Sequence, residues 1–420
     1  MQLVAYGAQD IYLTGNPQIT FFKVVYRRHT NFSMESIQQT WNGTSNGANG
    51  RCTATISRNG DLVHKMYLHV LNSGHRNNNN ANAGSDWIKT CEIEIGGQQI
   101  DKISGQWLEV WSELTEPNSG LCRSSTFYIN ASGKESIISA TNSASGTPYH
   151  PTGTPFQVMT CMGGCNASSI TSRSIYVPLP FWFCRNPGLS LPLIALQYHE
   201  VKVILEHQLT DSISASATDQ ELWVDYIYLD TDERRRFAQV SHEYLIEQLQ
   251  YQQITEQNQV LNFNHPVKEL IWCSASATNE TLGQSSISSL KTADSVKWKL
   301  TLNGHDRFAE RYTQYFTRQQ VYDYHTGHGH IRLNSVDGDK FYDYLQPSNY
   351  NTKGDGIYVY SFALKPEEHQ PSGTCNFSRI DNAQLQCDKD LTSDAEWSIY
   401  AVNYNVLRIM SGMGGLAYSN

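Results

Sequence analysis

Runs of β-branched and aromatic residues recur along nearly the whole chain, and each is bounded by glycine, proline, asparagine or serine. Such runs are typical of buried strands, and the residues between them are typical of turns. The runs are residues 19–26, 62–71, 91–95, 175–183, 201–205, 222–229, 267–272, 296–302, 358–364 and 397–410. Because their spacing is uneven and several connections are long, the pattern predicts β-sandwiches rather than a regular repeat.

Composition narrows the fold class further. Of the 420 residues, 39% are hydrophobic and only 17% are charged, and the chain contains 24 tyrosines and 29 glycines. A helical bundle would be richer in Ala, Glu, Lys and Leu, and a disordered chain would have fewer apolar and aromatic residues. The length suits two or three domains, or two large all-β units of about 200 residues each.

Charge and cysteine content limit the partners and the compartment. The net charge is −9, whereas a protein that binds nucleic acid needs a surplus of Lys and Arg, so we expect no direct nucleic-acid contact. The first ten residues lack signal-peptide features, and the longest strongly apolar run, 177–184, is too short to span a membrane. Nine cysteines without disulfide-framework spacing indicate free thiols in a reducing cytosol.

Helical patterns are few. Apolar residues three or four apart predict one amphipathic helix over residues 101–113, whose aromatic stripe packs against a sheet rather than holding a ligand. The stripe comprises Ile100, Ile103, Trp107, Val110, Trp111 and Leu114. The charged stretch 230–236 is predicted to connect two halves of the chain, and a short helical turn is predicted to follow at residues 242–249.

One short pattern suggests a duplication. Trp223 and Tyr226 lie near the end of the first half, and Trp397 and Tyr400 have the same spacing near the end of the second. Each pair follows a turn rich in proline or glycine and another strand-like run. The match is weak by itself, but it agrees with two similar β units.

Two clusters contain residue types that bind metals. The first consists of His325, His328 and His330, with Asp323 nearby. Zinc and copper sites need preformed geometry, and the two glycines between these histidines indicate a mobile turn, so a solvated loop is the favoured interpretation. Cys161 and Cys165 lack a second ligand pair at zinc-ribbon spacing, which favours a free-thiol loop there.

Charged side chains offer no clear site. The arginines at 234–236 follow acidic residues, which favours a self-neutralising connector over a phosphate site, whereas residues 27–29 suit a polyanion and a partner salt bridge equally. Four carboxylates are predicted to be solvated loop charges rather than a glycosidase pair: Glu367, Glu368, Asp388 and Asp390. Hydrolase and nucleotide-binding motifs are missing. We therefore predict no catalytic, cofactor-binding or metal-binding residues.

Residues 120–170 form a long stretch dominated by Ser, Thr, Gly and Asn. A compact domain rarely carries so long a loop unless it is exposed or functional. Sequons for N-glycosylation lie inside and outside this stretch, and the sequence leaves open whether any carries sugar. They begin at Asn31, Asn42, Asn130, Asn166, Asn279 and Asn376.

Several long motifs, in a fixed order, resemble the major capsid proteins of nucleocytoplasmic large DNA viruses. The first, at residues 6–32, reads YGAQDIYLTGNPQITFFKVVYRRHTNF. The others are DERRRFA at 232–238, HEYLIEQ at 242–248, NHPVKEL at 264–270, PSGTCNFSRID at 371–381 and NYNVLR at 403–408. These motifs frame nearly the whole chain, whereas residues 120–170 carry no family signature.

The resemblance implies an all-β fold of two consecutive eight-stranded antiparallel jelly-roll barrels, with few short helices and long loops. Residues 1–238 would hold an N-terminal arm and the first barrel, with an outer loop at about 115–175, and residues 239–420 a short linker and the second barrel. The resemblance also implies a homotrimer of pseudo-hexagonal outline in the virion shell, made and assembled in the host cytoplasm. Residues 120–170 would form an outward tower.

The resemblance also implies the partners. They would be neighbouring capsomers, minor capsid proteins and an internal membrane beneath the shell, with no cofactor and no enzymatic activity, and the segment before Pro17 would contact proteins beneath the barrel. Two other classes stay open from the residues alone. One is a jelly-roll protein that binds or cleaves glycans, since Trp and Tyr stack on sugars, and the other is a cellular scaffold.

Overall fold

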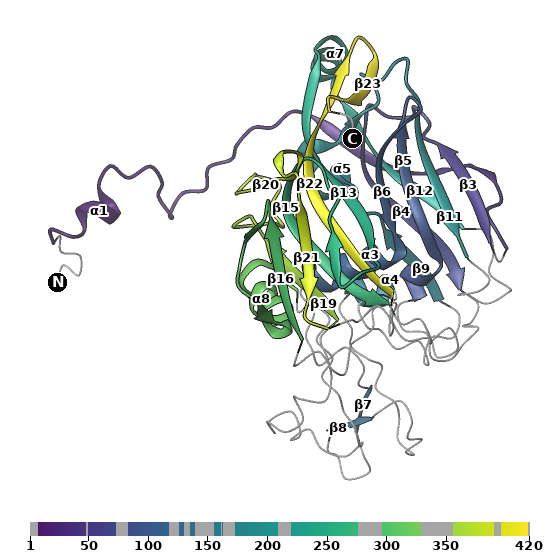
Figure 1. Ribbon diagram of the computed structural model, residues 1–420. Coiled ribbons are helices and arrows are strands. Elements are labelled where there is room, and N and C mark those ends of the chain that lie inside the picture. The colour runs from purple at the N-terminus through teal and green to yellow at the C-terminus, as the bar shows by residue number, and fades with distance from the viewer. Residues whose placement is uncertain are drawn as a thin grey trace.

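The computed structural model describes residues 7–47, 49–72, 83–116, 126–129, 135–138, 155–160, 162, 173–208, 220–275, 296–327, 329, 356–389 and 396–418. Within these ranges the chain forms two β-sandwiches that lie side by side (Figure 1). We call the sandwich built from β1 to β12 the first unit and the one built from β13 to β23 the second unit. Among the described residues, no helix has the length and apolar character needed to span a membrane.

The first unit consists of two antiparallel sheets. One sheet has the order β1–β12–β4–β10 with β9 also on β4, and the other has the order β2–β3–β11–β5–β6. The strands of the first sheet are β1 (Phe32–Gln39), β12 (Glu221–Leu229), β4 (Leu62–Asn72), β10 (Leu191–Pro192) and β9 (Arg173–Pro178). Those of the second are β2 (Trp41–Gly43), β3 (Gly50–Thr55), β11 (Val201–His207), β5 (Ile88–Ile95) and β6 (Gln98–Ser104).

The second unit repeats this plan. One sheet has the order β13–β22–β15–β19, with β20 on β15 and β23 on β22, and the other has the order β14–β21–β16–β17 with β18 on β16. The first sheet contains β13 (His242–Ile254), β22 (Glu396–Met410), β15 (Pro266–Ala275), β19 (Ile357–Ser361), β20 (Cys375–Asn376) and β23 (Met413–Leu416). The second contains β14 (Asn258–Val260), β21 (Ala383–Cys387), β16 (Lys297–Leu302), β17 (His305–Asp306) and β18 (Arg311–Tyr312).

The repeated strand order confirms the expectation of two similar β units. In each unit the first and last long strands pair with each other, and the order β1–β12–β4–β9 recurs as β13–β22–β15–β19. This is the jelly-roll arrangement, so the chain is a double jelly roll. A short additional sheet pairs β7 (Thr126–Ile129) with β8 (Glu135–Ile138), and it lies beyond one end of the sandwiches (Figure 1).

The motif that suggested the duplication does not itself superpose. Trp397 is buried between the two sheets of the second unit, whereas Trp223 is half-buried and stacks on Tyr67 on the outer side of β12. The tyrosines are reversed in the same way, since Tyr226 is in the core of the first unit and Tyr400 faces the first unit from outside its own sandwich. The two Trp–Tyr pairs therefore lie in equivalent strands, β12 and β22, but their side chains face opposite sides, so the shared spacing is a coincidence.

Helices are short; α1 lies in the segment before β1, and the others lie at strand connections. They are α1 (Ile11–Thr14), α2 (Ala83–Asp86), α3 (Gly105–Thr115), α4 (Pro155–Thr160), α5 (Trp182–Arg185), η3 (Pro187–Leu189), α7 (Thr231–Gln239), the π-helix η5 (Tyr315–Gln319), α8 (Gln320–Tyr324) and η7 (Phe377–Arg379). The helix predicted at 101–113 begins later, at Gly105, because the Ser104 hydroxyl caps it by accepting from the Trp107 N–H. Ile100 and Ile103 belong instead to β6.

Two other local predictions are wrong. Residues 19–26 form no strand and are exposed, because a strand needs a pairing partner and the described chain provides none for them. Residues 242–249 are not a helical turn but part of β13, which pairs with β22 over its whole length. The helix lies just before, at α7, where Asp230 caps the N-terminus and two acidic residues in the first turn favour the helix dipole.

The core of the first unit continues into the second. One buried cluster joins both sheets of the first unit to Ile246, Ile271 and Tyr400 of the second unit, and a separate cluster fills the second sandwich. The described cysteines are free thiols, as predicted: Cys52, Cys91, Cys184, Cys273, Cys375 and Cys387. Burial raises the pKa of Cys52 and of Cys184 to about 12, so these thiols stay protonated at neutral pH.

Candidate functional site

The junction between the two units has an apolar aromatic centre. Tyr400 on β22 is 1% exposed, and its ring lies 5.1 Å from that of Trp107 on α3. The Tyr400 hydroxyl donates to Gln106 Oε1 at 2.7 Å. Trp107 of the predicted stripe therefore packs against a sheet as expected, and that sheet belongs to the second unit.

Polar contacts beside this centre fix the register of the two units. The backbone N–H of Leu249 on β13 donates to Asp101 Oδ1 of β6 at 3.1 Å. The Gln248 side-chain amide donates to the carbonyl of Ile100, and Asn405 Nδ2 donates to Gln248 Oε1 at 2.8 Å. Because the Leu249 and Gln248 contacts join β13 of the second unit to β6 of the first, a slip of one unit along the other would leave buried polar groups unpaired.

A buried ion cluster lies at the same junction. Glu247 on β13 is 6% exposed, and its carboxylate is 2.8 Å from Arg185 Nη1 of α5 and 2.9 Å from Lys268 Nζ of β15. Arg185 also lies 4.1 Å above the ring of Trp111. Burial alone would raise the pKa of Glu247, but a hydrogen bond from His369 and the two cations outweigh it and hold this pKa at about 2. Glu247 is therefore ionised and tied to both units.

His325 is buried, which contradicts its assignment to a solvated loop. Its Nε2 lies 3.1 Å from Glu269 Oε2 and its Nδ1 lies 3.0 Å from Glu367 Oε1. Burial opposes the charged imidazolium, but these two carboxylates raise the pKa of His325 to about 9. Glu367 is thus a partner rather than a solvated charge, whereas Glu368 is exposed beside Lys365 as predicted.

The turn after His325 binds the end of α3. The Thr326 hydroxyl donates to the Thr115 carbonyl at 2.8 Å, and the Gly327 N–H donates to the Leu114 carbonyl at 2.7 Å. These bonds satisfy carbonyls that a helix C-terminus leaves without intrahelical partners. At Gly327 a Cβ would overlap the carbonyls of α3, so the close approach requires glycine.

This buried triad gives a pH dependence. The folded pKa of His325, about 9, exceeds its ordinary value of 6.5, so its contribution is complete below pH 6.5 and is lost as the pH rises through 9. The pKa of Glu367 is lowered despite burial, by hydrogen bonds from His325 and Thr326, so its contribution is lost as the pH falls through that lowered value. Burial and the Glu367 charge raise the pKa of Glu116. Its effect on stability is opposite to that of Glu367, because a carboxyl with a raised pKa makes the fold less stable as the pH rises.

We expect the free energy of unfolding of the wild type to fall by on the order of 3 kcal/mol between pH 6.5 and pH 10, because His325 loses its proton. The melting temperature should fall over the same range. The His325→Gln variant should lack this alkaline decline. Thermal scans at intervals between pH 5 and pH 10 measure both profiles. Parallel profiles for the two proteins would contradict this assignment of the triad.

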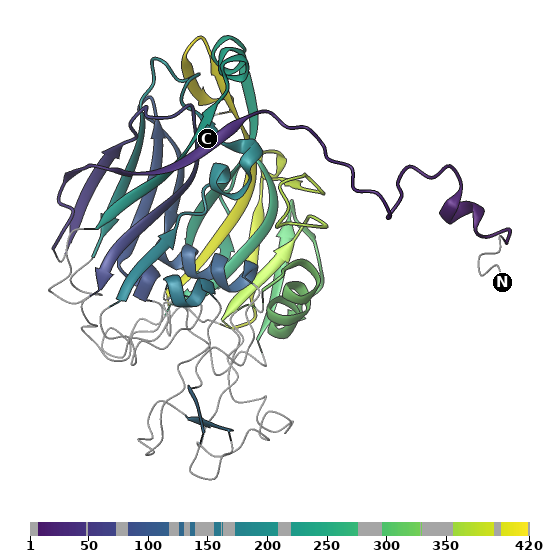
Figure 2. The ribbon, with the colours of Figure 1, turned by 180° about the vertical axis from the view of Figure 1, so that it is seen from behind.

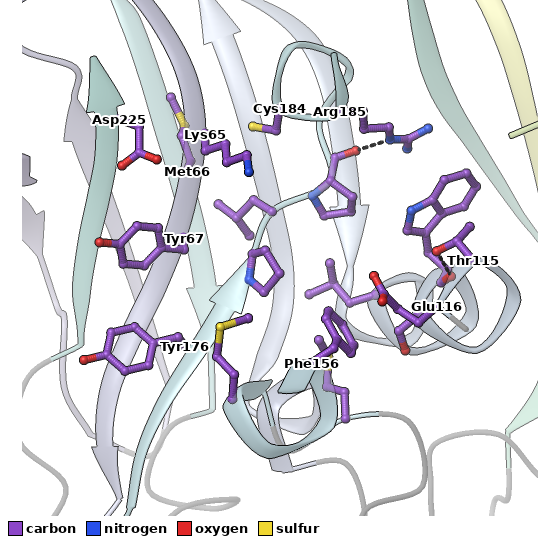
Figure 3. Close-up of a pocket in the computed structure, with 18 residues that line it drawn as sticks. Lys65, Met66, Tyr67, Thr115, Glu116, Phe156, Tyr176, Cys184, Arg185 and Asp225 are labelled. Atoms are coloured by element: carbon purple, nitrogen blue, oxygen red, sulfur yellow. Dashed lines mark hydrogen bonds between the residues drawn. The ribbon is translucent and has the colours of Figure 1, made fainter. Parts of the chain in front are cut away.

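A cavity of about 470 Å³ lies in the first unit, against the outer side of β4 and β9. Figure 3 shows Tyr67 and Tyr176 on the strands at one side, and Thr115, Glu116 and Phe156 on helical segments at the other. Leu108 and Met162 add to an apolar lining. The cavity therefore separates an exposed sheet face from α3 and α4.

Aromatic side chains continue from the cavity across this sheet face. Tyr67 lies between Tyr176, at 6.0 Å, and Trp223, at 6.5 Å, and His69 stacks on Tyr176 at 4.4 Å. Glu221 orders the edge by accepting from Trp223 Nε1 at 2.9 Å and by pairing with His69. We call Tyr67, His69, Tyr176 and Trp223 the aromatic patch. The sequence pointed to Trp223 only for its spacing from Tyr226, and to none of the other three, because alternation marks which residues face outward but not which strands become neighbours.

The segment before β1 extends away from both sandwiches (Figures 1 and 2). Residues 7–31 are exposed almost throughout, including Phe21 at 88% and Phe22 at 98%. The candidate basic residues 27–29 lie in this arm and are exposed. Large apolar side chains in such number on a segment without core contacts are typical of an interaction site.

The remaining candidates fall in different places. Arg234 of α7 lies 2.9 Å from Asp61 of the first unit, so part of the arginine stretch forms a protein contact. Asp388 accepts from the Lys297 N–H at 2.8 Å. Asn31, Asn42 and Asn376 are exposed. His328, His330, Cys161, Cys165, Asp390, Asn130, Asn166 and Asn279 lie outside the described residues. In the described part, no group of three or more His, Cys, Asp or Glu could hold a metal ion.

The chain matches two protein-family models over nearly its whole length. A model described as major capsid protein N-terminus matches residues 20–230, and one described as large eukaryotic DNA virus major capsid protein matches residues 233–328 and 326–415. The major capsid protein of Pyramimonas orientalis virus is 51% identical and that of Paramecium bursaria Chlorella virus 1 is 39% identical, with 100% of this chain and 99% of each relative covered.

Solved structures agree with these sequence matches. VP54 of PBCV-1 has a TM-score of 0.70 at 35% identity, covering 96% of this chain and 100% of that one. The Faustovirus major capsid protein has a TM-score of 0.64 at 12% identity, covering 96% of this chain and 94% of that one. At so low an identity the second match supports the fold alone.

Proposed function

The chain belongs to the family of major capsid proteins of large eukaryotic DNA viruses, and from this premise we propose that it builds the capsid shell as a homotrimer of pseudo-hexagonal outline. The capsid role is that of a structural protein. The observation that best supports a trimer is that the two units have the same order of strands in their sheets. Three chains with two similar units each present six similar units around a threefold axis, and such a body can tile a hexagonal lattice.

We propose no enzymatic activity for the chain. A shell protein acts through interface area and shape complementarity, and stable assemblies commonly bury about 2,000 Å² or more with apolar centres. In the described part, the buried Arg185–Glu247 ion pair and the hydrogen bonds from Thr326 and Gly327 to the end of α3 hold the two units together. This supports a rigid building block.

The two ends of the sandwiches support a proposed orientation and proposed partners. The β7–β8 hairpin lies at one end and α7 at the other (Figure 1). We assign the hairpin end to the virion exterior, and we expect the outer loop at about 115–175, most of which lies outside the described residues, to lie there as well. The opposite end would then face minor capsid proteins or an internal membrane, and the arm would bind there. The proposed division into residues 1–238 and 239–420 places α7 at the connection, and assembly is assigned to the host cytoplasm.

Size-exclusion chromatography with light scattering tests this proposal. We expect a species near 140 kDa, three times the 47.5 kDa chain, and hexagonal arrays in electron micrographs. A chain without residues 1–31 should still form trimers but lose contacts beyond the trimer, and a chain without residues 120–170 should fold but form weaker trimers. A monomer at all concentrations, or a monomer that binds oligosaccharide, would contradict the proposal.

A further inference from the structure

The contact between the two units of one chain can serve as a template for the contact between chains. This step rests on the proposed trimer, in which six similar units surround one axis. Within the chain, α3 of the first unit packs against the outer face of the sheet β13–β22–β15–β19 of the second. If the rotation that relates the two units is repeated, the second unit must present its equivalent of α3 to the first unit of the next chain.

Each half of this template has an identifiable equivalent. The helix α3 lies between β6 and β9, and the helical segment η5–α8 lies in the same place of the second unit, between β18 and β19. The sheet β1–β12–β4–β9 is likewise equivalent to β13–β22–β15–β19. The expected contact therefore joins α8 of one chain to the outer face of β1–β12–β4–β9 of another.

Both of these surfaces are exposed in the single chain. Tyr322 on α8 is 84% exposed, and Tyr176 in the aromatic patch is 37% exposed. In contrast, Tyr400, which lies on the corresponding sheet face of the second unit, is 1% exposed because α3 covers it. Aromatic residues of this kind are enriched in the buried centres of protein interfaces.

The contact between the two units also indicates which part of another chain could fill the cavity. In the second unit, the last turn of α3 occupies the place beside the turn that follows α8, where Thr326 and Gly327 bond to its carbonyls. The corresponding place in the first unit lies beside α4, in the connection that follows α3. That place is the cavity of about 470 Å³ bounded by Tyr67, Tyr176 and Phe156 (Figure 3).

We propose that the last turn of α8 of one chain docks into the cavity and onto the aromatic patch of a second copy of this chain, with Tyr322 as its central anchor. The contact is heterologous, since α8 and the patch are different surfaces, and three repeats close a ring. The first unit then has its sheet face covered by a neighbour, in the way that the second unit has its sheet face covered by α3.

Site-specific cross-linking in the full chain tests this contact. A photoreactive benzoylphenylalanine in place of Tyr322 should link to peptides containing Tyr67, Phe156 or Tyr176 of another chain, which mixing of isotope-labelled and unlabelled protein identifies. The matched control is the same replacement at Tyr198, which is 75% exposed and near the β22–β23 turn. It should not link to the patch. Links from Tyr322 to other surfaces of a trimer would overturn the proposal.

Charge substitutions give an independent readout. Tyr322→Glu and Tyr176→Glu should each raise the dissociation constant of the trimer at least tenfold, and Tyr198→Glu should not. Circular dichroism of the variants checks that the exposed positions tolerate the change, and if one does not fold, the cross-links decide. Unchanged trimer affinity in folded variants would contradict the docking site. A wild type that never trimerises would instead contradict the proposed function.

Discussion

Replacing Glu247 with alanine is expected to lower the free energy of unfolding by about 3–5 kcal/mol, because the change leaves a buried cation without its counter-ion. Lys268 is fully buried, and its Nζ lies 2.9 Å from the Glu247 carboxylate. The same substitution removes the 2.8 Å contact with Arg185, which belongs to the other unit. The loss therefore affects both the core of the sheet and the junction.

A surface ion pair on the same strand provides the matched control. Glu243 of β13 lies 2.8 Å from Arg408 of β22, but these side chains are 60% and 50% exposed. Solvent screens such a pair, so Glu243→Ala should cost only about 0–1 kcal/mol. Denaturant unfolding at pH 7 measures both variants. Equal losses for Glu243→Ala and Glu247→Ala would show that burial does not set the strength of the Glu247 cluster.

Much of the fold could be predicted from local patterns. The run 62–71 lies in β4 and the run 397–410 lies in β22. Both could be predicted because a run of apolar residues favours a buried strand whichever strands become its partners. Pairing itself is not local. The run 19–26 has strand composition and remains exposed, since a strand forms only where partner backbone is available.

The junction was harder to predict because its contacts join distant parts of the chain. His325 and Glu367 are 42 positions apart, and Glu269 comes near them because β15 pairs with β19. One local signal did exist. Lys268 and Glu269 stand beside the apolar run 267–272, and charges in a buried strand are stable only when they are paired. Such residues mark a buried ion pair, although the partner cannot be named from the sequence.

Replacing Tyr400 with alanine is expected to cost about 3–5 kcal/mol, because the change leaves a cavity at the centre of the junction. The Tyr400 ring packs against Trp107 of the first unit and lies 5.4 Å from Tyr251 of its own. Tyr400→Phe keeps this packing and removes only the hydroxyl that donates to Gln106 at 2.7 Å. It should cost about 1 kcal/mol.

Calorimetry of these variants tests whether the junction makes the two units unfold together. The wild type should show one transition, because one buried cluster extends across both units. Tyr400→Ala should lower the melting temperature and separate the transition into two, since the second unit keeps a core of its own. Tyr12→Ala is the control for loss of an aromatic ring, because Tyr12 is 89% exposed in the arm and should change the melting temperature little. A Tyr400→Ala profile that matches the Tyr12→Ala profile would mean that the aromatic contact does not couple the units, and the shell would then be built from two independently stable barrels.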